Sequence, residues 1–548
     1  MTLYTSKKVK LAGLILTAIL FVLFLLPFLN NVAYDAVIHF AFAEKFVEGL
    51  PFHFNANDSN IIASTSPFWT LLLIVLTKLF GSSFIIPLKI IIVVVWLITT
   101  YLIYLITRNI WKFSKLMQYS VLLVWLLNIS VLKNSLGGME NILSAMQLLL
   151  ILYLLYLYKK KLNIPRVILL GILSGWGLLT RPDIGALCLS IVLLFYITLF
   201  ISNKITGKQL SFYLCISLLF SVITLLPWYL YQYEMTGKII SDSAHSRIFT
   251  GRWNSTRLIN GILYFHPFLI MALFTAFLPF TAGVIIKLKS TSSSLIKNKN
   301  YRVIFSNENY FKLTSWLILL FGIIFYSFVA GGSHTGRYFL PFYPFLFLLG
   351  ISGLNIVYSK LSFKESFIII IALFLLGVNL YDYYNRTILG KQMESDVIEI
   401  IKAKENRKDI TSAFLRDVKY NINDTITLAI VEVQFRYFVD DRIIIQSLDG
   451  VTSDKVFKYM GKDDFPDYDR YILDTKPDLV EFDGWKSYLK SPPWHLNFLP
   501  RVFKNNILSE WDEKTENMKT GESFLWNSYL VTYVKEKDVK IDWDGKNN

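Results

Sequence analysis

Long apolar runs recur along this chain from Leu11 to Leu380, and they constrain its fold more than any other feature. A helix needs about 20 apolar residues to cross a bilayer, so the chain is expected to be a polytopic α-helical membrane protein. About eleven transmembrane helices are predicted. Their ranges are 11–29, 84–107, 117–133, 141–158, 166–180, 184–202, 210–230, 262–286, 313–330, 339–358 and 366–384.

The composition changes after Tyr384, where the sequence becomes charged and mixed. We therefore expect two domains, a membrane domain over 1–385 and a soluble C-terminal domain over 386–548. In the second domain, 393–406 is expected to be a helix, and 425–433, 442–447, 471–473 and 479–482 are expected to be strands. This pattern leaves α/β and α+β open. Four tryptophans follow, either as core residues or as a sugar-stacking surface: Trp485, Trp494, Trp511 and Trp526.

The net charge of +15 lies where a membrane protein would carry it. Lysines and arginines of the membrane part cluster in short loops, as the positive-inside rule requires, so a nucleic-acid partner is not favoured. The only two cysteines, Cys188 and Cys215, lie in apolar runs. This placement argues against a disulfide framework and against a cysteine metal site.

The same rule orients the chain. Lysines at 7, 8 and 10 place the N-terminus in the cytoplasm. The segment Pro67–Phe80 is apolar but short for a span, and counting it as one would turn the later basic loops outward. We therefore expect an interfacial or re-entrant helix there. The C-terminal domain is then extracytoplasmic.

This topology gathers titratable side chains on the outer side of the membrane. Nine of the eleven acidic residues up to Asn385 fall there, and so do all five histidines of the membrane part. The acidic residues are Asp35, Glu44, Glu48, Asp58, Glu140, Asp183, Glu234, Asp242 and Asp382; the histidines are His39, His53, His245, His266 and His334. Ionisable groups gathered at one face of a membrane bundle indicate a functional site.

The outer loops hold the candidate residues, each with a plainer alternative. The long first external loop, 30–66, begins with Asp35, which is either functional or a helix N-cap, and 35–46 is expected to be an amphipathic interfacial helix. Glu140 follows two glycines and would also suit a helix dipole. Arg181 and Asp183 could simply pair. Arg337 at a helix start opposes the dipole, which is easier to understand if an anion such as phosphate binds there.

The order of these motifs resembles a known family. The motifs follow one another along the chain in this order: Tyr34-Asp35-Ala36, Thr65-Ser66-Pro67-Phe68-Trp69, Gly138-Met139-Glu140, Leu179-Thr180-Arg181-Pro182-Asp183, and the late Gly331-Gly332-Ser333-His334 with Arg337-Tyr338. The set is similar to the GT-C superfamily of polyprenyl-phosphate-sugar glycosyltransferases, nearest to the bacterial branch with the mycobacterial arabinofuranosyltransferases. Protein O-mannosyltransferases and the aminoarabinose transferase of lipid A are more distant. Family members often carry Asp where this chain has Tyr34, and Arg where it has Ala41.

The resemblance implies an enzyme that moves a sugar from a polyprenyl-phosphate donor to a hydroxyl group with inversion. The acceptor would be an extracytoplasmic glycan, lipid or protein of the cell envelope, and the enzyme would lie in a bacterial plasma membrane. Asp35 would be the general base. Arg337, Arg181, Arg247 and His334 would bind the donor phosphate, and His39, Glu140, Asp183 and His245 would support the site or the acceptor.

A divalent metal (Mg, Mn or Ca) is a further possibility, with Asp35 and Glu140 as oxygen ligands. Two other functions stay open at this stage. One is a flippase or transporter for lipid-linked glycans, although such proteins usually place polar groups near mid-membrane. The other is a non-catalytic envelope-assembly subunit, favoured by the missing second Asp at Tyr34 and the missing Arg at Ala41.

Overall fold

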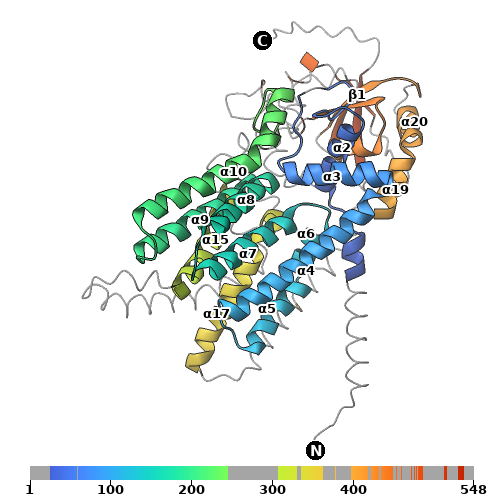
Figure 1. Cartoon of the computed structure of the whole chain (residues 1–548). Helices are drawn as coiled ribbons and strands as arrows, with labels where there is room; N and C mark the ends of the chain where they lie inside the picture. Colours follow the sequence, from blue (N-terminus) through green and yellow to red (C-terminus); the bar gives the residue numbers. More distant parts are fainter. Residues whose placement is uncertain are drawn as a thin grey trace, which may run out of the picture.

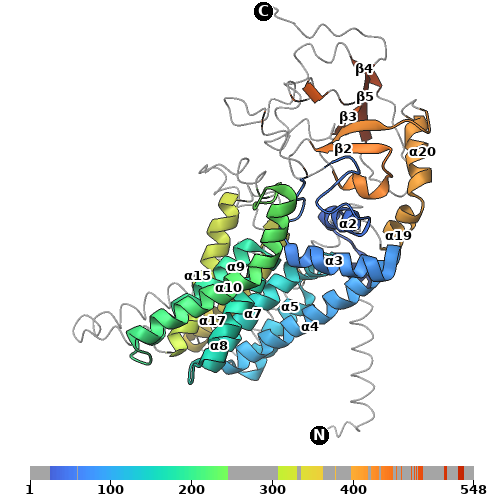
Figure 2. The same cartoon turned by 45° about the horizontal axis from the view of Figure 1, so that its top comes forward.

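The computed structural model describes residues 25–58, 60–242, 244, 307–329, 335–361, 397–417, 421–430 and 433–447, with shorter pieces that include three further strands. The helices of the first part form an elongated bundle, and a mixed sheet with two helices lies at one end of it (Figures 1 and 2). Three predicted spans lie wholly or largely outside the described residues, namely 11–29, 262–286 and 366–384.

The helices of the membrane part follow the apolar runs. They are α2 (Tyr34–Val47), α3 (Pro67–Phe80), η1 (Gly81–Phe84), α4 (Ile85–Asn109), α5 (Lys115–Leu127), α6 (Ile129–Leu136), α7 (Asn141–Tyr158), α8 (Ile164–Thr180), α9 (Pro182–Ile201), α10 (Gly207–Thr236), α15 (Asn307–Val329), α16 (Thr335–Tyr338), η4 (Leu340–Phe342) and α17 (Tyr343–Leu361). Within the described residues, 4 helical stretches are long and apolar enough to cross a membrane, or 5 with the bent pair of α5 and α6. The molecule is therefore a polytopic membrane protein. The total of about eleven spans stays a prediction.

One predicted span is broken. Residues 117–133 were expected to form a single helix, but α5 ends at Leu127 and α6 begins at Ile129, with a bend of 56° between them. Asn128 is the cause, because its backbone is extended and its side chain accepts a hydrogen bond from the Val131 amide. An Asn cap of this kind ends one helix and starts the next.

The doubtful segment Pro67–Phe80 is a helix of its own, α3, with Pro67 in its first turn. The chain turns sharply between α3 and α4 (Figures 1 and 2), at Gly81 and the short η1. Gly81 has φ +58, a conformation that glycine adopts without steric cost. The helix is present as expected, and its position in the membrane stays a prediction.

Helices α8 and α10 lie in close contact because glycines line their interface. A Cβ on Gly171 would come within 2.6 Å of the Ser217 carbonyl oxygen, and one on Gly175 within 2.6 Å of the Ser221 carbonyl oxygen. Small residues spaced four apart allow this approach in membranes, where the hydrophobic effect no longer drives helices together.

The C-terminal part combines helices α19 (Val397–Glu405), α20 (Arg407–Asp417) and η6 (Val433–Phe438) with five strands. The strands are β1 (Ile426–Ile430), β2 (Ile443–Ser447), β3 (Leu479–Gly484), β4 (Trp511–Lys514) and β5 (Tyr529–Lys535), in the order β2-β1-β3-β5-β4. β1 pairs in parallel with β2 and β3, and β5 pairs antiparallel with β3 and β4. The strands expected near 425, 442 and 479 are confirmed.

One expected strand, 471–473, is wrong at Tyr471, which is helical and buried. Its side chain is held in the core, where its hydroxyl donates to the Ser447 carbonyl oxygen at 3.4 Å. Trp511 lies in β4, and the other three tryptophans fall outside the described residues. The two described aromatic residues, Tyr471 and Trp511, therefore belong to a helix and to a strand.

Helix α2 differs from the expected amphipathic interfacial helix. The residues from Ala36 to Ala43 are all buried, so the helix has no solvated face there. It lies between α3 and the C-terminal part (Figure 2), and the ring of Phe40 contacts the rings of Phe84 and Tyr437 at 5.1 and 6.0 Å between centroids. Contact with another domain removes the need for a polar face.

The C-terminal sheet also contacts the loop after α2 directly. The Asn55 side chain donates to the Ile445 carbonyl oxygen at 2.9 Å and accepts from the Ile445 amide at 2.8 Å. Ile445 lies in β2, one of the two edge strands of the sheet. One amide side chain therefore satisfies both backbone groups of an edge residue, as a neighbouring strand would.

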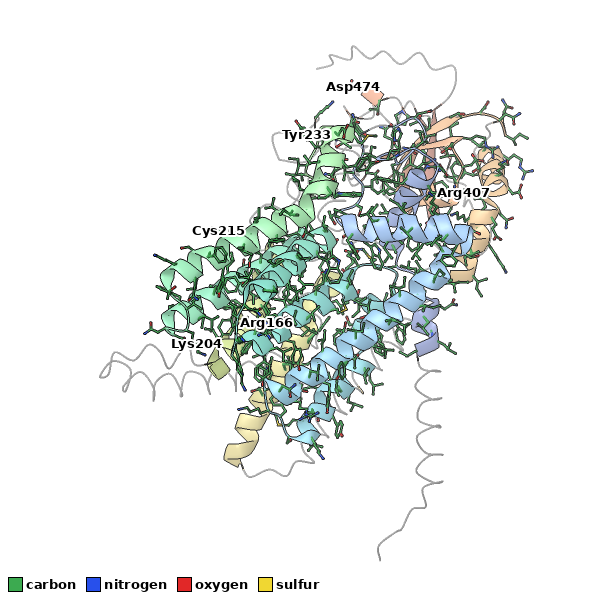
Figure 3. The ribbon with its side chains drawn as sticks, in the orientation of Figure 1. Arg166, Lys204, Cys215, Tyr233, Arg407 and Asp474 are labelled. Carbon is green, nitrogen blue, oxygen red and sulfur yellow. The ribbon has the colours of Figure 1, made fainter. Side chains whose placement is uncertain are left out.

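Basic residues of two short loops lie at the end of the bundle away from the sheet. Arg166 near the start of α8 and Lys204 after α9 are on that side, whereas Arg407 and Asp474 lie at the opposite end (Figure 3). This arrangement agrees with the positive-inside pattern read from the loops. The absolute orientation in the membrane stays a prediction.

Candidate functional site

The start of α2 is fixed against the Gly137-Gly138 loop. The Ala33 amide donates to the Gly137 carbonyl oxygen at 2.8 Å. Gly138 has φ +92, and a Cβ there would lie 3.3 Å from the Ala36 Cβ. The two glycines therefore permit a close backbone approach, which the sequence indicated.

A buried lysine, missed from the sequence, strengthens the same junction. Lys89 near the start of α4 donates from its ammonium group to the carbonyl oxygens of Asn31 and Leu136. These carbonyls precede the Asp35 and Glu140 segments, so one cation joins the two chain segments that carry candidate residues. The available signal was a single lysine inside an apolar run, because ionisable residues in such runs usually have a specific partner.

Asp35, in the first turn of α2, forms an ion pair with Arg337 of α16. The carboxylate side chain is 32% exposed and the guanidinium 14% exposed. Burial would lower the pKa of Arg337, but the Asp35 carboxylate and the neighbouring Tyr338 raise it above its usual value. The pair therefore keeps a charged base and a charged anion-binding group together at a partly open position.

Tyr338 lies between two guanidinium groups. The Arg337 carbon Cζ is 4.7 Å from the centre of its ring and the Arg181 Cζ is 5.1 Å from it. The Tyr338 hydroxyl also accepts a hydrogen bond from Arg337 at 2.9 Å. Aromatic faces attract cations, so Tyr338 holds two like charges near each other without direct contact.

Arg181 is held by buried polar partners between α8 and α9. Its guanidinium donates to both carboxylate oxygens of Asp183 at 3.3 and 3.2 Å and to the Asn141 side-chain oxygen at 2.7 Å. A carboxylate oxygen of Glu140 lies 4.0 Å away. Burial opposes the charge, but Asp183 and Glu140 raise the pKa of Arg181 above its usual value. The pairing of Arg181 with Asp183 that the spacing suggested is present.

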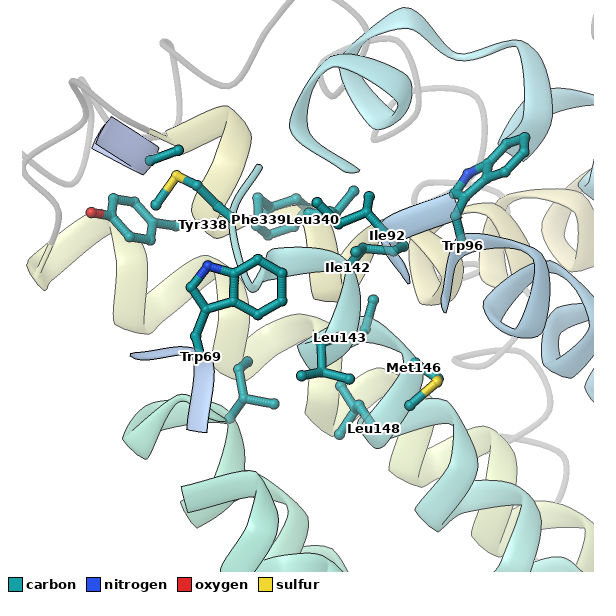
Figure 4. Close-up of a cluster of buried hydrophobic side chains, with 14 of the residues drawn as sticks. Trp69, Ile92, Trp96, Ile142, Leu143, Met146, Leu148, Tyr338, Phe339 and Leu340 are labelled. Atoms are coloured by element: carbon teal, nitrogen blue, oxygen red, sulfur yellow. The ribbon is translucent and has the colours of Figure 1, made fainter. Parts of the chain in front are cut away.

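Three polar atoms of this region are buried without a hydrogen-bond partner among the described residues: Glu140 Oε2, Asn141 Nδ2 and Arg337 Nε. Such atoms are uncommon in folded proteins and call for an explanation. The Trp69 indole nitrogen is a fourth, and Figure 4 shows Trp69 and Tyr338 as members of one cluster of buried hydrophobic side chains. Donors and an acceptor left open around two arginines fit a site that takes a polar ligand.

The structure thus brings together five of the residues chosen from the sequence: Asp35, Glu140, Arg181, Asp183 and Arg337. A sixth, His39, lies one turn after Asp35, and its Nδ1 is 3.0 Å from the Ser64 hydroxyl. Arg247, His245 and His334 fall outside the described residues. Tyr338 and Asn141 were missed, although each directly follows a residue that was chosen.

The metal prediction does not fit the residues that are described. Within those ranges, no group of three or more His, Cys, Asp or Glu side chains comes together as a set of ligands. Asp35 faces a guanidinium, and Glu140 lies nearest to another. A cation at either carboxylate would meet an arginine in contact with it. No step of the proposed chemistry is therefore assigned to a metal.

No family model matches the chain, and no curated protein matches its sequence. Solved structures do match. ArnT from Cupriavidus metallidurans, solved bound to undecaprenyl phosphate, is 13% identical, with a TM-score of 0.50, over 95% of this chain and 98% of that one. The oligosaccharyltransferase of Archaeoglobus fulgidus, solved with Zn and sulfate, is 14% identical, with a TM-score of 0.50, over 91% and 71%. The fold resembles that of GT-C membrane glycosyltransferases.

Ala41 is the position at which the sequence resemblance would place an Arg. It is 4% exposed on the buried part of α2. A long charged side chain would not fit there without moving the helix. The arabinofuranosyltransferase subgroup itself is not supported by these similarities.

Proposed function

We propose that this protein transfers a sugar from a polyprenyl-phosphate donor to a hydroxyl group of an extracytoplasmic acceptor. The observation that carries the proposal is the ion pair between Asp35 and Arg337 in a fold similar to that of membrane glycosyltransferases. A carboxylate and a guanidinium are the two groups that such a transfer needs, one for the proton and one for the phosphate. The undecaprenyl phosphate in the ArnT structure supports a donor of this class.

In the proposed reaction, Asp35 accepts the proton of the acceptor hydroxyl as its oxygen attacks the anomeric carbon. The bond from that carbon to the phosphate oxygen breaks, and polyprenyl phosphate leaves with the electron pair. Attack and departure on opposite faces invert the anomeric centre.

Arg337 is the proposed phosphate-binding group. Its Nη1 holds Asp35 and its Nη2 donates to Tyr338, while its buried Nε has no partner among the described residues. Guanidinium groups bind phosphate oxygens through paired, charge-assisted hydrogen bonds. When phosphate draws the guanidinium towards itself, Asp35 is released towards the acceptor hydroxyl.

Arg181 has a different proposed role, because Asp183 and Asn141 already occupy its guanidinium. Its Cζ lies 5.1 Å from the centre of the Tyr338 ring, and its role is to hold that ring and to add positive charge near the phosphate. Arg247 and His334 remain further candidates for the phosphate, and His39, Glu140, Asp183 and His245 for the acceptor.

The test uses the purified full-length protein in lipid nanodiscs with a panel of radiolabelled polyprenyl-phosphate sugars and an extract of envelope acceptors. Wild type should transfer label, and the transfer rate of Asp35→Asn should be about 10²–10⁴-fold lower. Asp409→Asn is the matched control, because Asp409 is exposed on α20, and it should retain the wild-type rate.

Other outcomes would contradict the proposal. The same protein placed in sealed vesicles tests transport: label that crosses the membrane without being transferred to an acceptor would indicate a transporter. A wild type that is inert towards the whole panel would favour an assembly subunit. Wild-type turnover by Asp35→Asn would remove Asp35 as the base.

A further inference from the structure

Helix α2 links the candidate site to the C-terminal domain. Asp35 lies in its first turn and Glu44 and Lys45 in its last turn. At 1.5 Å per residue, Asp35 and Glu44 are about 14 Å apart along the axis. The first end contacts Arg337, and the second end contacts the C-terminal domain (Figure 2).

Glu44 is bound by two cations of the C-terminal domain. Its carboxylate pairs with the Lys404 ammonium at 3.1 Å and with the guanidinium of Arg407, which is labelled in Figure 3. The Glu44 and Lys404 side chains are each 12% exposed, and Arg407 is 17% exposed. These are partly desolvated pairs, which resist screening by salt far more than exposed pairs do.

The position of Glu44 within α2 is unfavourable for the helix on its own. A carboxylate in the last turn of a helix opposes the helix dipole, so it costs stability in the isolated helix. Lys404 and Arg407 reverse that cost. Glu44 therefore stabilises α2 only when the C-terminal domain is in place.

Further contacts fix the same end of α2. Lys45, which is buried, pairs with Asp441 at 2.9 Å and with Glu48 at 2.7 Å. Arg436 pairs with Asp441 and donates to the Phe54 carbonyl oxygen at 3.2 Å. These bonds join the end of α2 and the loop after it to η6 and to the turn before β2, so the helix cannot move without breaking several of them.

We propose that the C-terminal domain positions Asp35 through α2, with Glu44 as the main positioning residue held by Lys404 and Arg407. This inference rests on the proposed function for the role of Asp35, but the mechanical link does not. A helix fixed at its far end holds its first turn in a defined place relative to the Gly137-Gly138 loop and Arg337. A base must lie within hydrogen-bond reach of the acceptor hydroxyl, so a small displacement is costly.

The test measures hydrogen exchange of full-length protein in nanodiscs, without substrate, for wild type and Glu44→Gln. The backbone amides of residues 34–40, the first half of α2, should exchange at least about tenfold faster in the variant, because local opening of the helix becomes easier. Amides of β1 and β2 should be unchanged. Asp440→Asn is the matched control, because Asp440 pairs with Arg442 at 2.6 Å inside the C-terminal domain.

A second readout is the transfer reaction. Glu44→Gln should lower kcat roughly 10–100-fold with little change in the donor KM, because the phosphate-binding group lies on α16 rather than α2. Glu44→Asp should recover part of kcat. If Glu44→Gln does not fold, Lys404→Gln removes one of the two cations and should give the same effects in weaker form.

The outcomes separate the two proposals. Unchanged α2 exchange in folded Glu44→Gln, or an increase spread equally over β1 and β2, would overturn the positioning role whatever the activity. Faster α2 exchange in a protein that transfers no sugar would leave the link in place and overturn the proposed function alone.

Discussion

Arg337 forms an ion pair with Asp35, although Arg337 lies in the single-turn helix α16 late in the membrane part and Asp35 lies in α2 near its start. The contact joins two motifs that the sequence presented separately. It gives Arg337 an anionic partner within the protein itself. Part of the negative charge expected near Arg337 from a bound phosphate is thus supplied by the Asp35 carboxylate.

Replacement of Arg337 should impair the transfer step. Arg337→Gln removes the charge that faces the leaving phosphate, and loss of one such group costs about 10²–10³ in kcat. Initial rates at saturating donor measure the effect. Arg108→Gln, an exposed arginine at the far end of α4, is the control, and turnover of Arg337→Gln within twofold of that control would contradict the assignment.

Replacement of Arg181 should act on stability. Arg181→Met leaves Asp183 and Asn141 without their buried partner, and breaking a buried ion pair in this way costs about 3–5 kcal/mol. Thermal unfolding in detergent measures the loss. Arg166→Met at the opposite end of α8 is the control, because Arg166 is only partly buried and should cost about 1 kcal/mol or less. Equal melting temperatures of the two variants would show that Arg181 is dispensable for the fold.

Gly138→Ala should displace the start of α2. The new Cβ would meet the Ala36 Cβ at 3.3 Å and the Phe40 ring at 3.4 Å, at a φ of +92. Gly237→Ala is the matched control, because Gly237 has φ +68 with nothing within 4 Å of its Cβ. Both variants should lose about 1–2 kcal/mol through the left-handed backbone, but only Gly138→Ala should also lose transfer activity. Equal activity in the two would argue against a site at this junction.

Gly175→Ala should force α8 and α10 apart. Its Cβ would lie 2.6 Å from the Ser221 carbonyl oxygen and 2.7 Å from the Thr224 Cβ, so the helices must shift. Overpacking of this kind costs about 1–3 kcal/mol. Gly207→Ala is the control, since its Cβ would meet only Phe200, at 3.8 Å. Unfolding midpoints in denaturant compare the two, and a neutral Gly175→Ala would mean that the helices can separate freely.

The link through Glu44 should depend on pH. Burial would raise the pKa of Glu44, but Arg407 and Lys404 hold it below the usual 4.5. A lowered pKa in the folded state means that the carboxylate stabilises the fold fully above about pH 4.5, and that this contribution is lost as the pH falls through the folded-state pKa. The stability difference between wild type and Glu44→Gln should therefore shrink from pH 6 to pH 3. A difference that stays constant over this range would contradict the ion-pair origin.

The apolar runs predicted most of the membrane helices, because a span needs length and composition that few other elements share. The break at Asn128 was not predicted, since an Asn inside an apolar run is compatible with a straight helix until its side chain is seen to cap the next one. The prediction that α2 is amphipathic was wrong for a different reason. The buried faces of α2 depend on contacts with a C-terminal part that lies hundreds of residues later in the chain.

The site followed the same division. Asp35, Arg181 and Arg337 could be chosen because the charge-derived topology places them on one side of the bundle with most of the other ionisable residues. Their partners could not, because Tyr338 between two arginines and Glu44 between two cations are relationships in space rather than in sequence spacing. Lys89 was overlooked because carbonyl oxygens, its partners here, leave no mark in a sequence.

Asn55 pairs with the outward-facing backbone groups of Ile445 in the edge strand β2. An uncovered edge strand can recruit a strand from another molecule, which leads to aggregation or to exchange of segments between copies. Here the residue that occupies the edge belongs to the loop after α2, not to the sheet. Residues 386–548 expressed alone would lack Asn55, so the backbone groups of Ile445 would be open to a strand from another molecule.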